Sequence, residues 1–137
     1  MLKEETKNSI IIFKPEEGFL RVTAKPDSCI ELADAMYDFE IGMKMVNGKP
    51  TPVLADTRNF SEHGDDVKSF YASKELAKHI SAMAILIDSL PTRLVGNFFI
   101  KINEPHVPTK LFTHQEEAIK WINKIVVENK KETFLTV

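Results

Sequence analysis

Residues 80 to 88 read ISAMAILID, a nearly continuous apolar run that stops at an aspartate. Its length suits a strand better than a helix, and an unbroken apolar run is typical of a strand covered on both faces. The earlier segment PVLADT, residues 52 to 57, has a similar form, because its apolar residues also lead to an aspartate. A helical pattern separates the two segments. This alternation of strands and helices predicts an α/β domain with a mostly parallel sheet.

The residues before this pair of strands predict an antiparallel hairpin and a helix. Residues 8 to 14 and 17 to 24 are β-branched or alternating, with a turn between them. A helix over about residues 29 to 45 follows, opened by Ser28 and Glu31 as a capping box. Its apolar residues are expected on two adjacent stripes: Ile30, Ala33, Tyr37 and Ile41 on one, and Leu32, Met36, Phe39 and Met43 on the other.

The residues after residue 57 complete the predicted order ββαβαβαβα. We expect helices from near Asp65 to about His79, over 90 to 102 and over about 114 to 128, with a last strand at 109 to 113. The 137 residues suit a single domain with its core at about 8 to 128. The tail, 129 to 137, either frays or packs against a neighbour.

Composition narrows the class of protein. The chain has 18 basic and 20 acidic side chains, a balance that argues against a nucleic-acid binder. Cys29 is the only cysteine, which favours a reducing, cytoplasmic setting. The apolar run near the N-terminus is too short for a membrane span. The glycines are scattered, so no phosphate loop is predicted, and we expect no cofactor.

Polar residues follow the two apolar strands. They are Asp56, Arg58, Asp88 and Ser89. Ligands of open α/β sheets gather beyond the carboxyl ends of the strands, so these residues could line one shared rim for a ligand or partner. The commoner interpretation, which we favour, is that Asp56 caps the following turn and pairs with Arg58.

The stretch SEHGDD, residues 61 to 66, is a second candidate. Ser61 and His63 are close in sequence, but no third group orients a base and no Gly-x-Ser-x-Gly turn is present. The sequence therefore predicts a protein without a catalytic set. His63 with Asp65 and Asp66 could hold a cation weakly, yet acidic residues are common at a helix start because they complement the macrodipole. We predict no metal site.

Two longer stretches resemble a known family. PTPVLADTRNFS, residues 50 to 61, and YASKELAKHISAMAILIDSLPTRLVGNFFIKINEPHVPTKLFTHQEEAIKWI, residues 71 to 122, look like the uncharacterised bacterial STAS-like proteins, which are related in fold to the anti-sigma-factor antagonists. The resemblance spans roughly residues 8 to 126. It implies one STAS-like α/β sandwich, packed by helices, and for the best-known members a regulatory role through protein contacts.

The resemblance also bears on the acidic stretch. In the antagonists, a serine near the start of the helix that follows the Asp-ended strand is phosphorylated, and this blocks partner binding. Aligning Asp56 on that strand-ending residue places Gly64, Asp65 and Asp66 about where the serine would be. An aspartate carries a permanent charge and cannot be toggled, and Ser61 lies several residues early. The resemblance therefore implies a non-enzymatic interaction module with a fixed acidic surface.

A carrier of small apolar ligands is the alternative. A related STAS-like branch resembles lipid-carrier domains, and the helices expected at 29 to 45 and 90 to 102 have wide apolar faces. Phe98, Phe99, Phe112 and Trp121 could border an apolar pocket, although core packing explains the same pattern. The identity of a protein partner or ligand stays open, and a homodimer is a reasonable expectation because two-fold dimers are the commonest soluble assembly.

Overall fold

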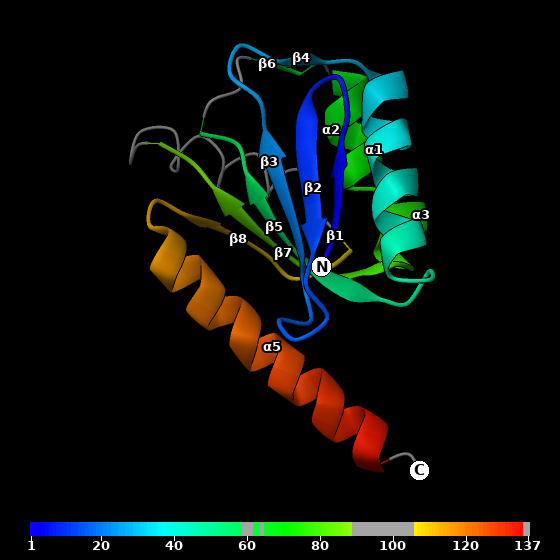
Figure 1. The fold of residues 1–137 in the computed structure, drawn as a ribbon, viewed down its shortest axis with the longest axis vertical. Coiled ribbons are helices and arrows are strands. Elements are labelled where there is room, and N and C mark those ends of the chain that lie inside the picture. Colours follow the sequence, from blue (N-terminus) through cyan, green and yellow to red (C-terminus); the bar gives the residue numbers. More distant parts are fainter. Residues whose placement is uncertain (59–61, 64, 89–105, 136–137) are drawn as a thin grey trace.

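A computed structural model describes residues 1–58, 62–63, 65–88 and 106–135 (Figure 1). Eight strands and four helices lie in these ranges. In chain order they are β1 Leu2–Glu5, β2 Ser9–Phe13, β3 Leu20–Ala24, β4 Cys29–Ile30, α1 Leu32–Met45, β5 Thr51–Asp56, β6 Glu62–His63, α2 Asp65–Tyr71, α3 Lys74–Ala77, β7 Ile80–Leu86, β8 Thr109–Phe112 and α5 Gln115–Leu135.

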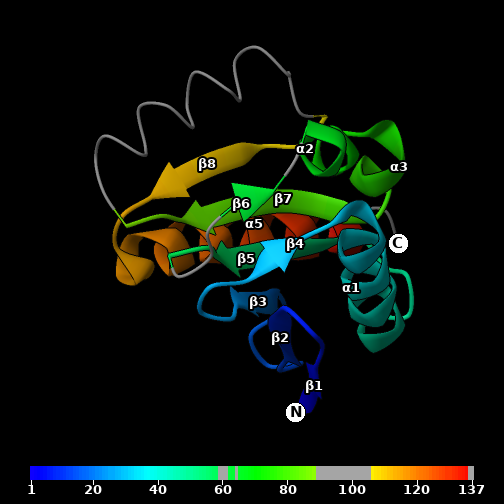
Figure 2. The ribbon, with the colours of Figure 1, turned by 90° about the horizontal axis from the view of Figure 1, so that it is seen from above.

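Six of the strands form one sheet in the order β1-β2-β3-β5-β7-β8. The first three strands pair antiparallel, and β3, β5, β7 and β8 pair parallel. Seen from above, β1 and β8 lie at opposite ends of the sheet (Figure 2). The predicted α/β fold with an antiparallel N-terminal hairpin is therefore confirmed. The central strand β5 has four consecutive buried residues, whereas burial alternates along β7, which we expected to be covered on both faces.

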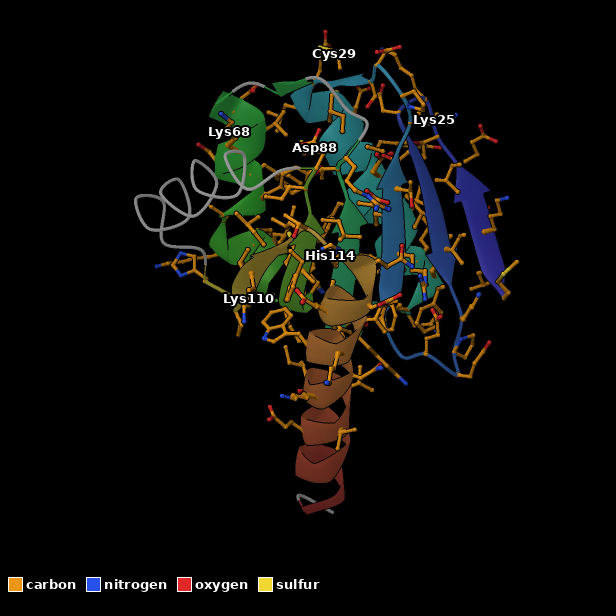
Figure 3. The ribbon with its side chains drawn as sticks, turned by 90° about the vertical axis from the view of Figure 1, so that its left-hand side faces the viewer. Lys25, Cys29, Lys68, Asp88, Lys110 and His114 are labelled. Carbon is orange, nitrogen blue, oxygen red and sulfur yellow. The ribbon has the colours of Figure 1, made fainter. Side chains whose placement is uncertain are left out.

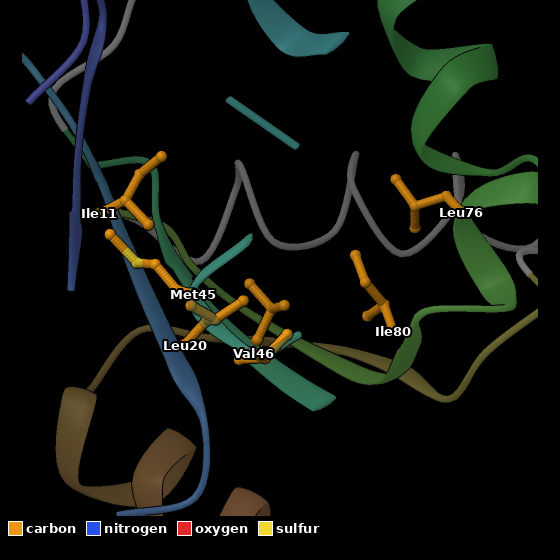
Figure 4. Packing of buried hydrophobic residues seen from close by; sticks show 7 residues of the cluster. Ile11, Leu20, Met45, Val46, Leu76 and Ile80 are labelled. Carbon is orange, nitrogen blue, oxygen red and sulfur yellow. The ribbon is translucent and has the colours of Figure 1, made fainter. Parts of the chain in front are cut away.

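Helices cover both faces of the sheet (Figure 1). The short helices α2 and α3 lie with α1 on one face, and α5 packs against β5, β7 and β8 on the other. Figure 4 shows the core under α1 and α3, which is formed by Ile11, Leu20, Met45, Val46, Val53, Leu76 and Ile80. The core under α5 is formed by Phe19, Leu54, Ala84, Leu86, Phe112, Ala118 and Ile122.

The sequence patterns missed three short strands, β1, β4 and β6, and misplaced one cap. Residues 2–5 form β1 although their sequence LKEE has no apolar alternation, and all four are exposed. Cys29 and Ile30 pair with β6 instead of starting α1, so α1 begins at Leu32. The backbone N–H of Glu31 donates to the Asp34 carboxylate at 3.1 Å, in place of the expected box between Ser28 and Glu31.

Two helix boundaries also differ from prediction. The single helix expected over 65 to 79 is divided into α2 and α3, because the Ser73 hydroxyl accepts the Leu76 N–H at 3.3 Å and caps a new helix. Helix α5 continues to Leu135 rather than ending near 128, so residues 129 to 135 of the tail are helical. Its Glu and Lys residues are good helix formers. The helix expected at 90 to 102 lies outside the described residues.

Candidate functional site

Asp56 ends β5 and lies between two parallel neighbours. In the sheet register it is opposite Thr23 of β3 and Leu86 of β7. Its carboxylate accepts three hydrogen bonds from Arg58: one from the backbone N–H at 3.1 Å, one from Nε at 2.9 Å and one from a terminal guanidinium nitrogen at 2.7 Å. The turn and the ion pair of the favoured interpretation are therefore both present.

The Asp56–Arg58 pair has a defined charge state. Partial burial alone would raise the pKa of Asp56, but the hydrogen bonds and positive charge of Arg58 outweigh burial, so the pKa lies below its ordinary value of 3.8. The Asp56 carboxylate in turn raises the pKa of Arg58. Both groups stay charged at neutral pH, and Asp56 is poorly suited to donate a proton.

Thr57 fixes the start of the loop that follows β5. Its backbone N–H and its hydroxyl both donate to the carbonyl oxygen of Leu86, at 3.0 and 2.7 Å. The Ile87 N–H donates to the carbonyl of Phe112 at 2.9 Å. These bonds hold the carboxyl ends of β5, β7 and β8 together. The exposed Asp88 follows β7 at this end of the sheet, where Cys29 also lies (Figure 3).

The other predicted site residues are only partly described. Ser61 and Ser89 lie outside the described residues. His63 is in β6, where its backbone pairs with Ile30. Asp65 begins α2, and the next residue, Asp66, is exposed, with its carboxylate accepting the Val67 N–H at 2.8 Å.

Helix α1 packs against α2 beside this edge. Ile30, Ala35 and Val67 form a small buried cluster, with Phe70 and Tyr71 of α2 packed on it. Burial raises the pKa of Tyr71 to about 12, and the nearby Asp38 carboxylate adds to the effect. This packing holds α1 and α2 side by side.

The outer face of α1 carries two large apolar side chains from the stripes that the sequence predicted. Met36 is 48% exposed and Tyr37 is 55% exposed. The residues that α1 buries are Ala35, Gly42 and Met45. A Cβ at Gly42 would lie 3.3 Å from Leu20 Cδ1, so the helix approaches the sheet through its smallest residues. The spacing of Ala35 and Gly42, seven residues apart, is the signal that could have identified the buried face.

We call the exposed residues of the two helices the α1–α2 surface. It consists of Ala33, Met36, Tyr37, Glu40 and Lys44 of α1 and Asp66 and Ser69 of α2. It combines an aromatic ring and a thioether with two carboxylates and one ammonium group. Such side chains suit contact with another protein, because aromatic residues and methionine are enriched in interfaces.

Two hollows among the described residues both lie away from Asp56. One, of about 220 Å³, is lined by Leu2, Lys3, Glu4, Ile41, Lys44 and Met45. The other, of about 420 Å³, lies along α5 and is lined by Lys120, Asn123, Lys124, Val127 and Glu128. Three of the six residues that line the first hollow and three of the five that line the second are charged. Neither lining includes Phe112 or Trp121, which were expected to border an apolar pocket.

The described residues contain neither a candidate metal cluster nor a candidate membrane-spanning helix. Within the described residues, no three His, Cys, Asp or Glu side chains are grouped so that they could hold a metal ion. None of the described helices combines the length and the apolar character needed to cross a membrane.

Comparisons with known proteins place the chain among uncharacterised proteins. The crystal structure of an uncharacterized protein from the DUF3478 family with a SpoIIAA-like fold, from Shewanella loihica PV-4, matches with a TM-score of 0.58 and 13% sequence identity, over 88% of this chain and 90% of that chain. This SpoIIAA-like neighbour confirms the expected STAS-like fold. A search of curated proteins found no match. A family profile matches residues 13–126, and the chain therefore belongs to the family described as "Domain of unknown function (DUF7793)".

Proposed function

We propose that this chain is a non-enzymatic regulatory module that binds another protein through its α1–α2 surface and the loop after β5. The observation that carries the proposal is the exposure of Met36 and Tyr37 on the same helix that packs against α2. Two large side chains of this kind, held on a rigid helix, suit an interface because little conformational entropy is lost when they are covered.

The charges around these side chains indicate the chemistry of the partner. On the α1–α2 surface the exposed carboxylates of Glu40 and Asp66 outnumber the one exposed ammonium group, that of Lys44. A partner surface with an apolar pocket bordered by Lys or Arg would complement it, because opposite charges across an interface steer association and fix its register.

The proposal assigns the acidic start of α2 a fixed charge. Asp65 and Asp66 occupy the region where the resemblance to anti-sigma-factor antagonists implies a phosphorylatable serine. Partner binding would then be constitutive, because no phosphorylation of this site would switch it on or off. Mass spectrometry of the native chain should find no phosphate on Ser61 or Ser69, and a stoichiometric phosphate on either would contradict this part of the proposal.

Asp56 and Arg58 have a positioning role in the proposal. Their ion pair and the two bonds from Thr57 to Leu86 hold the first residues of the loop on the edge of the sheet. A loop held in place at its start loses less entropy when a partner covers it. The same pairing leaves Asp56 ionised, which supports a role without proton transfer.

Affinity capture from extracts of the native host tests the proposal. The baits are wild type, Met36→Glu, Asp66→Arg and the control Val127→Glu, which changes an exposed apolar residue on the opposite side of the sheet. We expect a protein that wild type and the control retain and that both α1–α2 variants lose. Identical protein sets from all four baits, or no retained protein, would contradict the proposal.

A further inference from the structure

Strand β1 is an edge of the sheet that the described chain does not cover. It pairs with β2 on one side, and no described strand lies on its other side. All four of its residues are exposed, and Leu2 is 49% exposed. An edge of this kind presents unpaired backbone N–H and C=O groups to any strand that can align with it.

We propose that β1 pairs antiparallel with β1 of a second copy of this chain, so that the two six-stranded sheets join across a two-fold axis. Charged edge strands commonly prevent such pairing. The order of charges in β1 is complementary to itself in one register, and this complementarity favours a second copy as the occupant.

Backbone geometry limits the registers that a two-fold axis allows. Alternate residues of a strand direct their N–H and C=O groups toward the same edge, so symmetric antiparallel pairing joins residues whose numbers are both odd or both even. One allowed register places Lys3 opposite Glu5 of the second copy and Glu4 opposite Glu4. The neighbouring one places Lys3 opposite Lys3 and Leu2 opposite Glu4.

The first register has the better charge pairing. It forms the Lys3–Glu5 pair twice, and opposite charges directly across two strands stabilise a sheet. Glu5 already contacts Lys25 at 2.6 Å within the chain, so each Glu5 would lie between two lysines. The neighbouring register instead places two lysines in contact at the axis.

In this register the two Glu4 side chains face each other on the other side of the paired β1 strands, where lysines can flank them. Glu4 is opposite the buried Ile11 in the register with β2, so Glu4 is on the side of the sheet that α1 covers. The hollow of about 220 Å³ on that side brings Glu4 together with Lys44 of α1. Two Glu4 carboxylates at the axis would therefore be flanked by two Lys44 ammonium groups, while Leu2 and Ile41 from each copy lose exposure.

Reciprocal charge reversal tests this pairing in the full chain. Lys3→Glu would turn both facing pairs into two opposed carboxylates, and Glu5→Lys would turn both into two opposed ammonium groups. Each variant alone is therefore expected to have the mass of one copy, 15.6 kDa. In an equimolar mixture every facing pair has opposite charges. We expect light scattering to find twice that mass for wild type and for the mixture.

The mixture distinguishes pairing from simple damage to the fold. Glu5→Lys also breaks the contact with Lys25, but this loss is unchanged in the mixture and cannot explain recovery of the dimer. A wild-type chain with the mass of one copy, or a mixture that stays at that mass while both variants are folded, would overturn the proposal.

Engineered cysteines identify the register. In a Cys29→Ser background, which removes the native thiol, we expect Glu4→Cys to form a disulfide-linked dimer under mild oxidation and Lys3→Cys to form markedly less. The reverse result would overturn the register, and the absence of both dimers would overturn the strand pairing.

Discussion

Helices α1 and α5 pack on opposite faces of the sheet, and they bury different kinds of residues against it. On one face, α5 buries Ala118 and Ile122 completely and leaves Val127 51% exposed. On the other, α1 buries Ala35, Gly42 and Met45 and leaves Met36 and Tyr37 exposed. The apolar content of a helix therefore does not identify its buried face. Helix α1 comes close to the sheet at Gly42, and two of its larger apolar side chains, Met36 and Tyr37, stay available for a partner.

The largest expected effect is in the core under α5. Ile122→Ala should lower the free energy of unfolding by about 2–5 kcal/mol, because the side chain is fully buried and leaves a cavity. Val127→Ala is the matched control, since Val127 on the same helix is 51% exposed, and it should change stability by less than about 0.5 kcal/mol. Urea denaturation measures both, and equal losses would mean that α5 packs on the sheet differently.

The close approach of α1 gives the next effect. Gly42→Val should lower the free energy of unfolding by about 1–3 kcal/mol, because the new side chain meets Leu20 and forces the helix away from the sheet. Ala33→Val is the control, since Ala33 is exposed on the same helix, and it should cost no more than the helix-propensity difference of about 0.5 kcal/mol. A tolerated Gly42→Val would show that α1 does not lie so close.

Burial between α1 and α2 can be measured by titration. The chain has two tyrosines, so Tyr37→Phe leaves Tyr71 as the only one. Its phenol should ionise with a pKa of about 12 in the folded protein, as followed by ultraviolet absorbance. The folded pKa of Tyr71 is above its unfolded pKa. The contribution of its neutral phenol to folding stability is therefore fully present below the ordinary value of 10.0 and is lost as the pH rises through about 12. Ionisation near pH 10 in a folded chain would contradict the described packing.

The smallest expected effect is at the Asp56–Arg58 pair. Asp56→Asn should lower the free energy of unfolding at pH 7 by up to about 1 kcal/mol, because the Arg58 side chain is 39% exposed and solvent screens the pair. The folded pKa of Asp56 is depressed, so its contribution is present above the ordinary value of 3.8 and is lost as the pH falls through the folded pKa. Wild type and variant should therefore converge in acid, and a difference that grows there would exclude this assignment.

The fold could be predicted because its signals are local and repeated. PVLADT and ISAMAILID both form parallel strands, and neither pattern depends on a distant residue. The Asp56–Arg58 pair was predictable for the same reason, since residues two apart across a turn meet without help from the rest of the fold.

The features that sequence reasoning missed depend on neighbours that are distant in the chain. β1 is a strand because it pairs with β2, although its own residues are charged. Cys29 and Ile30 leave the helical pattern because β6 is beside them. The buried face of α1 was not identified because α1 has apolar residues around most of its circumference, and only contact with Leu20 decides that Gly42 faces inward.

Site-specific cross-linking tests the proposed function most directly. A photoreactive phenylalanine analogue at residue 37, on the face of α1 left exposed, is compared in native host cells with the same analogue at residue 127 on α5. We predict that residue 37 forms one discrete adduct with another protein, that residue 127 does not, and that Asp66→Arg removes the adduct. Equal labelling from both positions, or no adduct from residue 37, would contradict the assignment of the α1–α2 surface as the binding site.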